Sequence, residues 1–193
     1  MAERSSVPGH KGRVIAIAAA SDMLWKLNWE IGQLVRELRR SEETPFASQG
    51  AAFHAFNCAV TAWHVVDWAW VEGKDKLGGN KKKWIKNITD ECPQLAICQA
   101  LSNNGKHAIG SYGGDLEARE IVTFKSVRGE NGDLVQFVGS FRITLSYKGD
   151  DYEAVDLFRS AGKYLQTHMV KAGVLDGLWR HGYVFDGESL EAD

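Results

Sequence analysis

The spacing of the hydrophobic residues changes once along the chain, and this change restricts the possible folds more than any other feature. From Met23 to Leu38, apolar side chains recur every three or four residues, which is typical of a helix with one buried side. In residues 134–147 they alternate with polar side chains, as in a strand with one buried face. That face is expected to consist of Val135, Phe137, Phe141, Ile143, Leu145 and Tyr147. The chain is therefore predicted to combine helices with a β element.

The helical part is predicted to be a bundle of about four helices. They are expected near residues 23–40, 51–72, 93–104 and 152–172, the last of them beginning as extended chain or a cap. Pro93 suits a first helical turn, and Gly173 is expected to end the last helix. Residues 73–87 are lysine-rich and are predicted to be a loop with one helical turn around Trp84.

The β element is predicted to be an antiparallel hairpin at about residues 119–147, because Asn131-Gly132 is a strong turn signal between two alternating segments. A hairpin is not stable alone, so it should cover one side of the bundle. The predicted fold class is thus mainly α, a helical bundle with an inserted antiparallel β-hairpin.

A chain of 193 residues suits one domain, which is expected to span residues 13–172. Residues 1–12 are expected to form a loose N-terminal tail. Residues 173–193 contain Trp179, Tyr183 and Phe185 and are expected to form a tail that docks on the domain or on a partner protein.

The composition excludes several classes of protein. A 44% apolar and 25% charged content is ordinary for a globular domain, and a net charge of -2 gives no overall attraction to nucleic acid. Three cysteines suit structural thiols in a reducing compartment better than a disulfide framework. The short apolar run near the N-terminus continues into a helical pattern, so a cytoplasmic protein is predicted. Residues 51–70 include Asn57 and Asp67, which would be costly in lipid, so no membrane association is expected.

The predicted second helix has a polar stripe in an apolar sequence. Asn57, Thr61, His64 and Asp67 fall close together around the helix axis at about 100° per residue. Such groups are expected to be buried and to have partners. They can form a structural network in which His64 pairs with Asp67, or they can line a cleft facing residues 103–107.

The second alternative has a definite chemistry. A histidine near neutrality can transfer a proton, a carboxylate can orient it, and a lysine can hold a phosphate. An asparagine can stabilise a developing oxyanion. Together these groups suit attack of a ribose 2′-hydroxyl on its own phosphate, which requires no metal.

Residues 51–109, with a polar residue inside the second helix and an Asn-x-Lys-His ending at Asn104 to His107, resemble the HEPN superfamily. The resemblance implies a helical and often homodimeric ribonuclease of toxin–antitoxin, CRISPR or phage-defence systems. It implies His107 as the acid-base, Lys106 and Asn104 as phosphate ligands, and support from His64, Asp67 and Asn57. No arginine lies between Arg40 and Arg119, where the family has one before the histidine. A non-catalytic member is therefore an equal alternative, and the pattern also resembles uncharacterised bacterial and phage proteins.

The only basic concentration consists of Lys74, Lys76, Lys81, Lys82, Lys83 and Lys86, near Trp84, and the last four of these lysines are the predicted nucleic-acid-binding residues. It is expected to guide an RNA backbone, although a solvated loop is the simpler alternative. A metal site formed by His64, Asp67, His107 and His168 is considered but not favoured, so no metal or other cofactor is predicted. The predicted function is a metal-independent endoribonuclease or RNA-binding module. The alternative is a non-enzymatic protein that binds a partner or a second copy.

Overall fold

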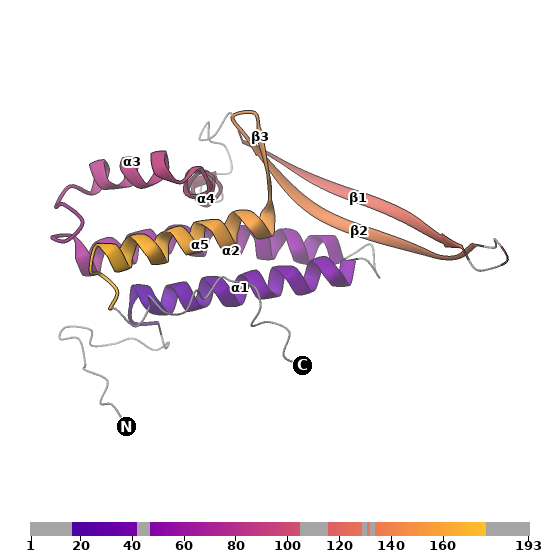
Figure 1. The fold of residues 1–193 in the computed structure, drawn as a ribbon, viewed down its shortest axis with the longest axis horizontal. Coiled ribbons are helices and arrows are strands. Elements are labelled where there is room, and N and C mark those ends of the chain that lie inside the picture. The colour runs from indigo at the N-terminus through magenta and orange to yellow at the C-terminus, as the bar shows by residue number, and fades with distance from the viewer. Residues whose placement is uncertain (1–16, 42–46, 105–115, 129–130, 132–133, 177–193) are drawn as a thin grey trace, which may run out of the picture.

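The computed structural model describes residues 17–41, 47–104, 116–128, 131 and 134–176. The helices in these residues are α1 (Ala20–Ser41), α2 (Ala47–Gly73), α3 (Lys81–Glu91), α4 (Pro93–Asn104) and α5 (Ala154–Lys171). The strands are β1 (Leu116–Arg128), β2 (Leu134–Tyr147) and β3 (Asp150–Glu153). The predicted fold class, mainly helical with an inserted antiparallel β element, is confirmed (Figure 1).

Helices α1 and α2 form the main pair of the bundle, and α5 packs against both of them. α2 contributes small buried residues such as Ala55, Ala59 and Ala62, while α1 contributes Leu24, Leu27 and Ile31. Small side chains on one helix let large ones on its neighbour reach between them, which gives dense packing. α4 packs on α2, and α3 contacts α4. The core therefore lies between α1, α2, α4 and α5, and buried side chains of α3 and β2 complete it.

The three strands form one antiparallel sheet in the order β1-β2-β3. Phe141, Ile143 and Leu145 of β2 are buried, whereas Arg142 between them is exposed, so the predicted alternation is confirmed there. The side chains of Val135 and Phe137 lie outside those that the structure describes. The pair β1 and β2 extends well beyond the helices (Figure 1). β3 is an addition to the predicted hairpin, and it leads directly into α5.

Both ends of α5 follow from local sequence. Glu153 caps the start, since its carboxylate accepts a hydrogen bond from the backbone N–H of Asp156 at 3.1 Å. At the other end Gly173 has a φ of 70°, which suits glycine. The N–H groups of Gly173 and Val174 then bond to the carbonyls of Val170 and Met169, as in a Schellman cap. The prediction that Gly173 ends this helix is confirmed. Leu175 is buried, so the described start of the predicted tail 173–193 belongs to the body.

The prediction of a lysine-rich loop with one turn is wrong, because α3 is a helix of 11 residues. Asn80 caps it, with its side-chain oxygen accepting from the N–H of Lys83 at 3.0 Å. Trp84 and Ile88 are buried one turn apart. The cap and this pair of anchors outweigh the lysines, whose number suggested a loop.

The three cysteines are free and buried, as expected for structural thiols. Burial raises the pKa of Cys58, of Cys92 and of Cys98, which keeps these thiols protonated and unreactive. Among the described helices, none has an apolar stretch long enough to cross a membrane.

Candidate functional site

The polar stripe predicted on α2 does not lie in the core. Asn57 is exposed, and His64 and Asp67 are partly exposed. Thr61 alone is buried, and its hydroxyl accepts a hydrogen bond from Lys26 of α1 at 2.6 Å. The expectation of a buried stripe is therefore wrong for Asn57. The reason is that α2 packs through its alanine and valine side, which leaves the side of Asn57 uncovered.

Asp67 has a partner other than His64. Its carboxylate accepts a hydrogen bond from Lys81, at the start of α3, at 2.8 Å. Both side chains are 43% exposed, so this ion pair contributes little to the stability of the fold. It does fix the beginning of α3 against the end of α2. Asp67 thus pairs with Lys81 and not with His64, its predicted partner in a structural network.

Lys106 and His107, predicted to act with the stripe, lie outside the described residues, as does the side chain of Asn104. Asn57 is exposed, so no described helix covers its side chain. The predicted catalytic roles stay predictions.

Metal ligation was considered for residues from three helices. Within the part of the chain that the structure describes, no group of three or more histidine, cysteine, aspartate or glutamate side chains is arranged to hold a metal ion. His64 belongs to the outward side of α2, whereas His168 lies between α3 and α5. These two histidines therefore lie on different surfaces of the molecule.

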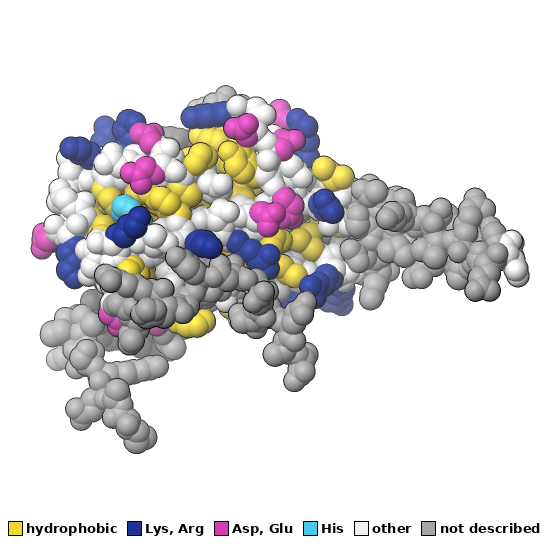
Figure 2. Space-filling view, viewed as in Figure 1, with side chains coloured by type: hydrophobic (Ala, Val, Ile, Leu, Met, Phe, Trp, Pro, Cys, Tyr) yellow, Lys and Arg dark blue, Asp and Glu magenta, His cyan; other side chains and the backbone are white. Residues whose placement is uncertain are grey.

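A cleft between α3 and α5 brings together aromatic and polar side chains that are far apart in the sequence. Its volume is about 480 Å³. Its lining consists of Lys76, Leu77, Trp84, Glu91, Tyr164, Thr167, His168, Lys171 and Ala172. On this side of the molecule, apolar surface lies between α3 and α5, with charges of both signs around it and a histidine at its edge (Figure 2).

The aromatic wall of the cleft is a chain of ring contacts. Tyr164 and His168, one turn apart on α5, stack with ring centres 5.6 Å apart. Trp84 of α3 lies 6.2 Å from the His168 ring and stacks on Trp70 of α2 at 5.7 Å. The Trp84 ring is anchored in the core, whereas Tyr164 and His168 are half-buried and border the cavity. The Tyr164–His168 ring pair is therefore held beside a buried tryptophan at the edge of the cavity.

Hydrogen bonds fix the polar groups of the cleft. The indole N–H of Trp84 donates to Nε2 of His168 at 3.0 Å, and the hydroxyl of Tyr164 donates to Glu91 at 2.7 Å. Because Nε2 accepts, the histidine is neutral and carries its proton on Nδ1. Burial lowers the pKa of His168, with a further lowering by Lys171 and an opposing effect of Glu91. Burial, together with the bond to Glu91, raises the pKa of Tyr164. Both rings are thus uncharged at neutral pH.

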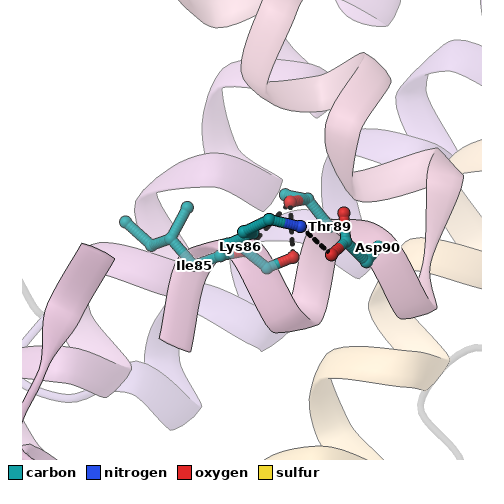
Figure 3. A network of polar contacts seen from close by, with 4 residues as sticks. All are labelled: Ile85, Lys86, Thr89 and Asp90. Carbon is teal, nitrogen blue, oxygen red and sulfur yellow. Dashed lines mark hydrogen bonds and ion pairs between the residues drawn. The ribbon is translucent and has the colours of Figure 1, made fainter. Parts of the chain in front are cut away.

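The predicted RNA-binding lysines lie on α3, at different distances from its N-terminus. Lys81, Lys82 and Lys83 occupy the first turn, where the helix dipole disfavours positive charge. Lys86 forms an ion pair with Asp90 on the same helix, and Thr89 bonds to the carbonyls of Ile85 and Lys86 (Figure 3). Lys82 and Lys83 are exposed and carry positive charge toward solvent. They are the better candidates for contact with an anion.

Sequence reasoning missed the cleft. His168 was considered there only as one residue of a metal site that was not favoured, and Tyr164 was assigned no role. The available signal was the spacing of two rings four residues apart beside a neighbouring tryptophan-containing segment. Glu91 gave no signal, because its partner Tyr164 is 73 residues away.

Comparison with protein-family models gives no match for this chain, and none of the curated proteins or solved structures compared with it is significantly similar. The resemblance to the HEPN superfamily therefore stays a prediction. What the molecule does must be inferred from its own residues.

Proposed function

We propose that the protein binds single-stranded RNA, with a base in the cleft between α3 and α5 and neighbouring phosphates beside the first turn of α3. The observation that carries the proposal is the Tyr164–His168 ring pair, which borders a cavity next to a lysine-rich helix start. Single-stranded nucleic acid is commonly bound by this combination of ring faces for bases and cations for the backbone.

The cleft has the dimensions and groups that a nucleobase needs. Its volume of about 480 Å³ lies in the range of small-molecule sites. Thr167 and Glu91 also line the cleft, and their side-chain oxygens can accept hydrogen bonds from the edge of a base. A stacked base contributes roughly 1 to 3 kcal/mol to binding. The neutral rings of Tyr164 and His168 add no repulsion toward an uncharged base.

The lysines supply the second half of the proposed site. Lys81 pairs with Asp67, but Lys82 and Lys83 are exposed in a first turn where positive charge is unfavourable for the helix, so their position is better explained by an anionic ligand than by folding. The backbone N–H groups at a helix N-terminus also favour a phosphate. Since net charge is -2, binding would depend on this local patch.

The test is fluorescence anisotropy with a labelled single-stranded RNA of about 12 nucleotides. Tyr164→Leu keeps an apolar side chain but removes the ring, and it should weaken binding roughly 5- to 150-fold, the equivalent of one lost stack. Lys82→Gln with Lys83→Gln should weaken binding and flatten its salt dependence by about 0.7 per lost phosphate contact. Lys148→Gln, in the turn between β2 and β3, is the matched control and should change neither quantity.

Absence of binding at low salt would refute the proposal. An equal loss in the Lys148→Gln control would also refute it, because binding would then follow total charge and not the site. A single-stranded DNA of the same sequence, run in parallel, shows whether the ribose hydroxyls contribute.

Cleavage is a separate and finer proposal, which depends on His107 as the acid-base. Incubation of the wild-type protein with the same RNA in EDTA, beside His107→Ala, tests it. Discrete products that disappear in the variant would support a metal-independent endoribonuclease. Intact RNA in both samples, with binding retained, would leave an RNA-binding module without cleavage activity.

A further inference from the structure

The outward side of α1 and α2 exposes several large apolar side chains. They are Trp25 at 56%, Trp29 at 59%, Phe53 at 68%, Phe56 at 40% and Val71 at 69% exposed. Single exposed apolar residues are normal, but a group of them on neighbouring helices usually marks an interaction surface. We call these residues, together with the polar side chains between them, the outer face.

Both helices turn their exposed residues to the same side. Lys26 bonds to Thr61, and the N–H of Ala20 bonds to Glu72, so the two helices are antiparallel. The centre of the exposed side of α1 lies between Trp25 and Trp29, and that of α2 runs along the line from Phe53 to Val71. At about 100° per residue, Lys26 lies about 80° from the first centre and Thr61 about 80° from the second, in the same rotational sense along each helix. Since the two helices run in opposite directions and contact each other at Lys26 and Thr61, these equal offsets place both exposed sides on the same side of the helix pair. The aromatic side chains therefore form one surface.

On α2 the outer face has the spacing of a coiled-coil seam. Six of its residues on α2 follow one another at intervals of alternately four and three positions, as a and d residues do, and Phe56 lies beside this line. They are Phe53, Asn57, Val60, His64, Asp67 and Val71. A seam of this kind is normally covered by another helix. Polar residues at a few seam positions specify the register and number of the helices.

The seam is complementary to itself when its direction is reversed. The intervals read the same from either end, so an antiparallel copy places Phe53 opposite Val71. The same register places Asn57 opposite Asp67, where an amide can donate to a carboxylate. It also places Val60 opposite His64. Apolar ends thus meet apolar ends, and each Asp67 meets a hydrogen-bond donor.

The same two-fold axis also brings the tryptophans together. The bonds of Lys26 and Ala20 to α2 set which residues lie side by side. They place the middle of the seam beside the part of α1 between Trp25 and Trp29. In the antiparallel arrangement, Trp25 therefore lies opposite Trp29 of the second copy. A central aromatic cluster is the usual site of the strongest contacts in an interface.

We infer that the outer face is the interface of a symmetric homodimer, in which α1 and α2 of two copies form an antiparallel four-helix bundle. The exposed aromatic side chains present on the order of 400 Å² of surface, if each is about half exposed. A standard interface buries about 800 Å² on each partner, so the polar residues around them must supply the rest. This inference does not rest on RNA binding.

Sedimentation velocity of the full chain from about 1 to 100 µM tests the interface. The wild type should be a dimer at the upper end. Trp25→Glu with Trp29→Glu places charge at the two-fold axis and should raise the dissociation constant at least about tenfold. Ile121→Glu is the matched control, because Ile121 is 45% exposed on β1 and lies outside the outer face. It should dimerise like the wild type.

The antiparallel register has its own test. Asn57→Asp places two carboxylates opposite each other across the interface and should weaken the dimer. Adding Asp67→Asn to the same chain restores a donor opposite each carboxylate and should recover dimerisation. A wild-type monomer over the whole range overturns the proposal and leaves the face to the chain's own termini or another protein. Unchanged dimerisation in the tryptophan variant also overturns it, as does failure of the double variant to recover.

Discussion

Two surfaces of this protein combine a histidine with tryptophans, and they differ in how their polar groups are held. On the outer face, His64 lies beside Asn57 and Asp67 on one helix, all at least partly open to solvent. In the cleft, His168 accepts a hydrogen bond from Trp84 of another helix and stacks on Tyr164. The first set is close in sequence and loosely held, whereas the second is distant in sequence and fixed.

The difference shows what a helical pattern can and cannot indicate. Periodicity states which residues share a side of a helix. It does not state whether a neighbouring helix covers that side. The α2 stripe was visible because its members are near one another, whereas the cleft depends on Trp84 and His168, which are 84 residues apart.

Replacing a tryptophan should reveal the largest difference in stability between the cleft and the outer face. Trp84→Ala should lower the free energy of unfolding by about 3 to 5 kcal/mol, because it leaves a cavity beside Trp70 and removes a hydrogen bond. Trp29→Ala in the monomer should change it by no more than about 0.5 kcal/mol. Urea unfolding at protein concentrations too low for dimerisation measures both. Equal losses would mean that the two tryptophans are equally embedded.

Replacing His168 or His64 should give a smaller difference in the free energy of unfolding. His168→Leu removes the acceptor of the Trp84 N–H, and an unsatisfied buried donor costs about 1 to 3 kcal/mol. His168→Gln can present an amide oxygen and should recover part of this loss. His64→Leu, on the outer face, should stay within about 0.5 kcal/mol of the wild type. A larger loss for His64→Leu than for His168→Leu would reverse the comparison.

The pH dependence should also separate the cleft from the outer face. Burial lowers the pKa of His168 below its usual value of about 6.5, so the unfolded chain binds a proton more readily than the folded one. The stability is complete above that usual value and is lost as the pH falls toward the lowered pKa of the folded state. Urea midpoints between about pH 8 and 5 should show this loss in the wild type. His168→Gln should show a smaller one, and equal slopes would contradict the assignment.

Much of the fold could be predicted because its signals are local. The apolar spacing of α1, the proline that begins α4 and the alternation in β2 each depend on a few neighbouring residues. The cap at Gly173 is of the same kind. α3 was missed because its lysines suggest a loop, while its stability comes from Asn80 and from the burial of Trp84 and Ile88.

The candidate site was less predictable for a physical reason. Of the catalytic residues proposed from the sequence, Asp67 is paired with Lys81 and Asn57 is exposed, and neither fact follows from their own helix. The cleft needs α3 and α5 to pack side by side, which no pattern within either helix determines. His107 and Lys106 lie outside the described residues, so their roles stay predictions.

The smallest expected effect on stability concerns the lysines of α3. Lys82→Gln with Lys83→Gln should raise the free energy of unfolding by about 0.3 to 1 kcal/mol per lysine at low salt, because it removes positive charge from the start of a helix. Lys86→Gln, one turn later, should lower it by about 0.2 to 0.5 kcal/mol, because it breaks the pair with Asp90. Urea unfolding at low salt and at about 1 M salt measures both, and screening should remove both effects. The two variants should change the free energy of unfolding with opposite signs, and only the stabilised variant should bind RNA more weakly. This result would mean that the first-turn lysines bind a ligand although they destabilise the helix. Equal signs would mean that they serve the fold, and would remove the reason for assigning them to RNA.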